Sequence, residues 1–172
     1  MIDFRYWRGQ SMMDNVIPRI VVCEDTESMS YSISGDINAE FVWPHAVETG
    51  DRVIRINLKG VQYINSVGVK NWLRTFPFAG KKVELFEVNV HVMDAFNMAP
   101  AMQLGCQIKS FFVPVYCENC EEKFELIQTK DVDFSGETKI QLKPCSCGLM
   151  PQIDTDLDMY LTCIGEDERE AS

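Results

Sequence analysis

Short apolar runs bounded by turn residues predict five β-strands in the first two thirds of the chain. Several of these runs are rich in β-branched residues, which strands favour. The predicted strands cover residues 19–23, 29–34, 52–58, 82–88 and 107–115.

Two segments between these runs carry the periodicity of amphipathic helices. The first has apolar residues at i, i+3, i+4 and i+7 and precedes Pro77, which helps to end a helix. The second repeats that period after Asn89, a residue type that caps helix N-termini. The apolar positions are Val69, Trp72, Leu73 and Phe76 in the first segment and Val92, Met93, Phe96 and Ala99 in the second.

The resulting order, β–α–β–α–β, predicts an α/β fold with a mainly parallel or mixed sheet and helices packed on it. A further short helix is expected over residues 38–47, although Pro44 disfavours its second half. The chain of 172 residues, 46% of them hydrophobic, suffices for one core of about 100–150 residues with a small satellite.

The character of the sequence changes after Val115. Residues 1–116 hold 12 acidic and 11 basic side chains, whereas residues 117–172 hold 14 and 5. We therefore expect a domain over 1–116, an appendage over 117–165 and a disordered charged tail over 166–172. The acidic second part disfavours binding of nucleic acid, while the alternative is that its charge serves solubility alone.

Four cysteines frame the appendage in two close pairs, Cys117 with Cys120 and Cys145 with Cys147. The C-x-x-C and C-x-C pairs are separated by 24 residues, a pattern that resembles a zinc ribbon. Thiolates are soft ligands that suit a tetrahedral zinc ion, so structural zinc is the expected cofactor. Free thiols and a redox pair are the alternatives, but a redox C-x-x-C usually begins a helix near a βαβ unit.

A β-hairpin is expected to bring the two cysteine pairs together, with its tip near Ser135 and Gly136. Its expected apolar strand positions are Phe124, Leu126 and Ile127 on one side and Ile140 and Leu142 on the other. The other three cysteines, Cys23, Cys106 and Cys163, are expected to be small buried hydrophobic residues, Cys163 within a strand-like run. His45 and His91 are isolated from the quartet, and we expect neither to be a ligand.

A serine, Ser66, lies where the third strand gives way to the first helix. A hydroxyl or amide side chain there caps the free backbone N–H groups, and the same groups favour an added phosphate. The residues alone leave open whether Ser66 is a simple helix cap or a modified site.

The order of segments around Ser66 resembles the STAS family, the anti-sigma-factor-antagonist type of module, over roughly residues 17–116. The resemblance is carried by ISGDIN, VIRINLKGVQYINSVGVKNWL and KKVELFEVNVHVMDAFNMAPAMQLG. The family motif is Asp-Ser-Ser/Thr-Gly-Leu after an apolar strand, and here Asn65, Ser66, Val67, Gly68 and Val69 follow one. Asn65 thus replaces the acid and Val67 the second hydroxyl residue.

The resemblance implies a STAS-like sheet with packed helices and a non-enzymatic switch. In such antagonists the unmodified form binds an anti-sigma factor kinase, and phosphorylation of the serine matching Ser66 releases it. Other STAS domains bind partners without being phosphorylated. The implied partner-binding residues here are Asn65, Ser66, Val67 and Gly68.

No motif of an enzyme is visible. The sequence lacks a glycine-rich phosphate loop, a G-x-S-x-G elbow and an H-E-x-x-H helix, and a site with four sulfurs leaves no ligand position for water. No signal peptide and no membrane span are seen, so a cytoplasmic protein without a membrane partner is expected. A regulatory protein-binding module is the preferred hypothesis, a scaffold subunit is the alternative, and the oligomeric state is left open.

Overall fold

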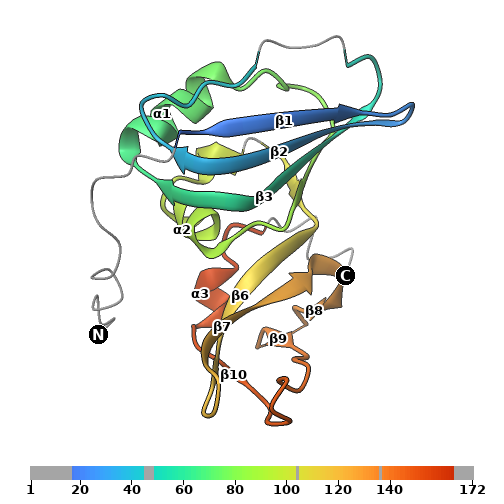
Figure 1. The fold of residues 1–172 in the computed structure, drawn as a ribbon. Coiled ribbons are helices and arrows are strands. Elements are labelled where there is room, and N and C mark those ends of the chain that lie inside the picture. The colour runs from blue at the N-terminus through green and yellow to red at the C-terminus, as the bar shows by residue number, and fades with distance from the viewer. Residues whose placement is uncertain (1–16, 45–48, 104, 136, 165–172) are drawn as a thin grey trace.

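The computed structural model describes residues 17–44, 49–103, 105–135 and 137–164. Its largest element is a five-stranded sheet with the order β1-β2-β3-β4-β5 (Figure 1). These strands are β1 (Arg19–Glu24), β2 (Ser28–Ile37), β3 (Val53–Ile64), β4 (Val83–Phe86) and β5 (Gln107–Ile108). Strand β1 runs antiparallel to β2, and the other neighbours are parallel.

Two α-helices lie in the crossovers from β3 to β4 and from β4 to β5, whose strands are parallel. Helix α1 (Ser66–Thr75) joins β3 to β4, and α2 (Val90–Met98) follows β4, with the 3-10 helix η2 (Pro100–Gln103) after it. Both predicted helices are confirmed, and so is the mixed α/β class with helices packed on the sheet.

The helices cover one face of this sheet. Along β3, Ile54 and Ile56 are fully buried, whereas Arg55 and Lys59 are exposed. This period of two places alternate side chains on opposite faces, one packed and one solvated. Trp72 of α1 and Phe96 of α2 are fully buried in the core on the packed side.

The prediction of a helix over residues 38–47 is wrong for residues 38–44, the part of this segment that the structure describes. Residues 38–44 contain no helix, and residues 45–48 lie outside the described part. Phe41 and Trp43 are buried while Val42 is exposed, the alternation of an extended chain. Asn38 begins a turn before this stretch, and its carbonyl accepts from the Phe41 N–H at 3.2 Å. The Asn71 side chain of α1 donates to the Ala39 carbonyl at 2.9 Å, so this turn is held against α1.

The run 107–115, predicted as one strand, is divided between two sheets. Strand β5 ends at Ile108, and β6 (Ser110–Cys117) begins two residues later in a separate three-stranded sheet. Backbone hydrogen bonds set the point at which the chain leaves the first sheet for the second. The Lys109 N–H donates to the Leu85 carbonyl and the Phe112 N–H donates to the Val88 carbonyl, each at 2.8 Å.

The second sheet has the order β10-β6-β7, with β7 at Glu121–Gln128 and β10 at Gln152–Ile153. A small third sheet pairs β8 (Val132–Asp133) with β9 (Lys139–Ile140), after the 3-10 helix η3 (Thr129–Asp131). The expected hairpin is therefore corrected: residues 124–127 pair with β6, and Val132 is the residue opposite Ile140. Ser135 does lie between β8 and β9, and Gly136 is outside the described residues.

The run around Cys163 is not a strand: its first residues belong to the short helix α3 (Leu157–Tyr160), and Cys163 lies in the turn that follows it. Helix α3 packs against α2. The Asn97 side chain donates to the Tyr160 carbonyl and accepts from the Cys163 N–H. Cys163 and Cys106 are buried as expected, but Cys23 is exposed because β1 is an edge strand.

One hydrophobic core includes Ile56 of the first sheet, Val113 of the second sheet and Leu161, which follows α3. Among the described residues, no helix combines the length and the apolar character needed to cross a membrane. The tail expected over 166–172 lies outside the described part of the chain.

Candidate metal centre

The first cysteine pair lies on the tight turn between β6 and β7. Cys117 is the last residue of β6 and is buried, and the Cys120 N–H donates to its carbonyl at 3.2 Å. Glu121 then adopts φ of +64°, and β7 returns alongside β6 with Glu121 opposite Cys117. The C-x-x-C spacing thus places two thiols on one side of a closed turn.

The second pair lies on a loop that is closed by its own backbone. The Cys145 carbonyl accepts from the Gly148 N–H, and the Cys145 N–H donates to the Leu149 carbonyl, both at 2.8 Å. Gly148 has φ of +88°, a conformation that glycine adopts without strain. Strand β10 follows at once and pairs Gln152 with Tyr116, which brings the loop to the cysteine end of β6.

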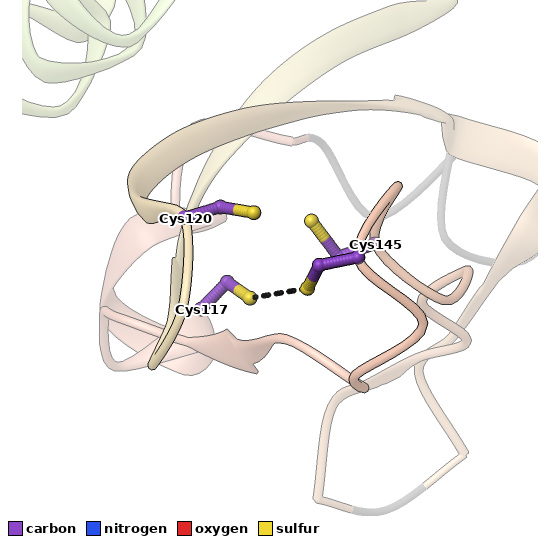
Figure 2. Close-up of side chains that lie close together, drawn as sticks. Cys117, Cys120 and Cys145 are labelled. Carbon is purple, nitrogen blue, oxygen red and sulfur yellow. Dashed lines mark hydrogen bonds between the residues drawn. The ribbon is translucent and has the colours of Figure 1, made fainter.

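The four sulfur atoms converge. All lie within 4.8 Å of one another, and those of Cys117 and Cys147 are 3.5 Å apart. Figure 2 shows the side chains of Cys117 and Cys120 pointing across toward that of Cys145. The grouping of the four predicted cysteines is therefore confirmed, and together they can hold a metal ion.

The donor set fits a tetrahedral thiophilic ion. Four sulfurs at about 2.3 Å from one ion would be roughly 3.8 Å apart, close to the separations present. An ion bound this way would join the β6–β7 turn to the loop before β10.

A lysine that the motif did not indicate accompanies the cluster. Lys123 of β7 donates a hydrogen bond to the Cys145 sulfur at 2.9 Å. Its ammonium offsets part of the negative charge that four thiolates carry around a divalent ion. The signal in the sequence is that Lys123 is the single basic residue within 117–129.

The hydrogen bonds within the cluster give the thiols different acidities. The bond from Lys123 lowers the pKa of Cys145 to about 5, and a backbone bond at Leu149 lowers the pKa of Cys147. Hydrogen bonding to the Cys145 sulfur raises the pKa of Cys120 to about 11. These bonds favour the charged form of Cys145 and Cys147 over that of Cys120, and a bound cation would displace the protons that the thiols still hold.

The second predicted site, around Ser66, lies apart from the cysteines. Figure 1 shows α1 beside strands β1 to β3 and the β6–β7 turn at the other end of the molecule. Ser66 is exposed as the first residue of α1, and Val67 beside it is exposed as well. The N-cap is Asn65, whose side-chain oxygen accepts from the Gly68 N–H at 2.8 Å, so Ser66 is not the cap.

Gly68 fixes the start of α1 against the end of β2. It is buried, and a Cβ atom on it would lie 1.9 Å from the Ile37 carbonyl oxygen. The same carbonyl accepts a hydrogen bond from the Asn65 N–H at 3.2 Å. The motif glycine is thus required for packing, whereas Ser66 faces solvent.

Comparisons of the chain with protein-family models, with curated proteins and with solved structures found no match.

Proposed function

We propose that this chain is a non-enzymatic regulatory module that binds a protein partner through the start of α1 and is stabilised by a structural zinc ion. The observation that carries the proposal is the form of the α1 N-terminus. Ser66 and Val67 are exposed there, while Asn65 and Gly68 hold the backbone in place. A rigid turn with an exposed hydroxyl is suited to recognition that depends on the state of that hydroxyl.

Zinc is the proposed ion because four thiolates are soft ligands and their sulfurs surround one point. A four-sulfur site leaves no position for water or substrate, which argues for a structural role. Elemental analysis of protein purified without a metal-affinity tag should find one zinc per chain. A content near zero with four reactive thiols would refute this part.

The resemblance to the STAS family supports a partner switch at Ser66. Phosphorylation would add about −1.5 to −2 charge at the first position of α1, next to unpaired backbone N–H groups. The fold should tolerate this charge because Ser66 is exposed. A partner surface fitted to the unmodified turn, such as that of an anti-sigma factor kinase, would not.

The test compares the proteins captured from native lysate by wild type, Ser66→Ala and Ser66→Asp, identified by mass spectrometry. We expect Ser66→Asp to lose a partner that Ser66→Ala retains. Gln62→Glu is the charge control, since Gln62 is exposed near the end of β3. Capture of the same partners by both Ser66 variants would refute the switch, provided that thermal melts show folded protein.

A scaffold subunit is the second candidate, and β1 is the observation that favours it. Within the described residues, no strand pairs with the outer edge of β1, where Val21 and Val22 are exposed. Exposed apolar edge strands are sites of sheet extension between chains. A concentration-independent oligomer that buries Ser66 would favour this candidate over the switch.

A further inference from the structure

The β6–β7 hairpin has a second face, turned away from the core and the cysteine sulfurs. Along β6, Phe111, Val113 and Val115 are buried, so the residues between them point to the opposite face. The register places Pro114 opposite Phe124 and Phe112 opposite Leu126. Directly opposite residues have adjacent side chains, so the apolar residues of this face form one strip. We call it the hairpin patch, and it comprises Phe112, Pro114, Tyr116, Phe124 and Leu126.

Three residues of the hairpin patch have large apolar side chains that are exposed to solvent. Phe124 is 59% exposed, Tyr116 43% and Leu126 38%, while Phe112 and Pro114 are half-buried. Single exposed apolar residues are ordinary, but a contiguous group on one sheet face indicates an interaction surface.

The surroundings of the hairpin patch are mainly acidic. Glu118 is exposed on the turn beyond Tyr116, and Glu121 is exposed where β7 begins. Asp154 is exposed beside Pro114, whose carbonyl accepts from the Asp154 N–H at 3.0 Å. Lys59 lies at the other end, where its Nζ is 5.7 Å from the centre of the Phe112 ring and 3.8 Å from a Glu87 carboxylate oxygen. Carboxylates thus border the part of the strip around Tyr116 and Pro114.

We infer that the hairpin patch is a docking surface for a protein partner that presents apolar side chains bordered by lysine or arginine. Its acidic border attracts such a partner and orients it, while the apolar strip supplies the contact area. The same border repels anionic lipid and phosphate backbones. It also repels a second copy, because residues 117–172 carry 14 acidic against 5 basic side chains.

This inference rests neither on Ser66 nor on the identity of the metal. Sequence spacing gave no sign of it, because the hairpin expected at first paired residues 124–127 with another segment. The pairing of β6 with β7 is what places the two halves of the patch together.

The test measures binding of a fluorescent seven-residue peptide of alternating leucine and lysine by anisotropy. Its counterpart of alternating leucine and glutamate has the same apolar content with the opposite charge. The patch variant is Phe124→Thr with Leu126→Thr, because threonine keeps the β preference of the strand. The matched control is Val21→Thr with Val22→Thr, which removes two exposed apolar side chains from β1. Zinc content and thermal melts are measured for each protein.

We expect the lysine peptide to bind wild type, and its Kd to rise about tenfold or more in the patch variant. The Kd of the control variant should stay within about twofold of that of wild type. The glutamate peptide should bind wild type at least about tenfold more weakly than the lysine peptide, and added salt should weaken the binding of the lysine peptide. Asp154→Asn with Glu118→Gln should weaken it too, without unfolding the protein.

Three outcomes would overturn the inference. The first is that the patch and control variants lose binding of the lysine peptide equally, or that wild type does not bind this peptide at millimolar concentration. The second is equal binding of the two peptides. The third is a wild-type dimer in sedimentation that the patch variant abolishes, which would assign this face to a second copy. The Ser66 variants should bind the lysine peptide like wild type, so failure here is separable from failure of the switch.

Discussion

Replacing Gly68 by alanine tests whether the start of α1 is fixed by its contact with β2. A Cβ atom at Gly68 would lie 1.9 Å from the Ile37 carbonyl oxygen, 2.4 Å from its carbon and 2.9 Å from the Asn38 nitrogen. A close carbon–oxygen contact is about 3.3 Å, so a shift of more than an ångström is needed. All three atoms belong to the backbone, and no side-chain rotation relieves the overlap.

The expected magnitude follows from two opposing terms. Overpacking of this kind costs typically 1–3 kcal/mol, and a backbone overlap belongs at the upper end of that range. Alanine regains about 0.5–1 kcal/mol within a helix relative to glycine. We therefore expect Gly68→Ala to lower the free energy of unfolding by about 2 kcal/mol, and Tm by about 4–8 °C for a chain of this size.

The assay is unfolding in urea, monitored by tryptophan fluorescence, because Trp72 of the same helix is fully buried and becomes exposed on unfolding. Lys70→Ala is the control, because Lys70 is exposed on α1 and should change stability by less than about 0.5 kcal/mol. If Gly68→Ala is as stable as Lys70→Ala, α1 does not lie against Ile37 as described.

Two further outcomes are expected. Removing the metal with a strong chelator should reduce hydrogen-exchange protection in residues 145–153 and spare β3, because that loop is held to β6 by the short strand β10, the Asp154 N–H and the sulfurs. Unchanged protection would contradict a structural metal. Hydrogen bonds from the Ser28 hydroxyl and the Ser28 and Glu27 N–H groups lower the pKa of Asp25 below its usual 3.8. A carboxyl whose pKa is lower in the folded protein stabilises the fold at pH values above its pKa in the unfolded chain. Wild type should therefore be more stable than Asp25→Ala at neutral pH, and this advantage should vanish as the pH falls through the pKa of Asp25 in the folded protein. An advantage that stays constant down to about pH 2 in urea melts would refute this.

The parts of the fold that sequence predicted correctly are those that local pattern determines. The apolar face of α1 and the Asn89 cap of α2 depend on residues within a few positions, and both helices form as expected. The cysteine quartet was predicted by the same kind of information, because spacing within each pair decides whether two thiols share one turn.

The parts that sequence missed depend on distant contacts. Nothing in the apolar run 107–115 marks Lys109 as the point where the chain leaves one sheet for another, since hydrogen bonds to Leu85 and Val88 set that point. Residues 38–44 resemble a helix locally, but a hydrogen bond from Asn71 holds a turn at Ala39, and the buried Phe41 and Trp43 lie in an extended stretch after that turn. Lys123 joins the metal centre because β7 returns alongside β6, which no spacing rule states.

Strand β6 connects the five-stranded sheet to the cysteine cluster. Eight residues of strand span roughly 27 Å at about 3.4 Å each, and this strand leads from the edge of the first sheet to Cys117. Buried Val113 and Val115 tie it into the common core along the way. Because the core is shared, we expect the two larger sheets to keep one relative position. Any partner that touches both the start of α1 and the hairpin must match one fixed separation, and a tether of the wrong length gains no avidity from the second contact.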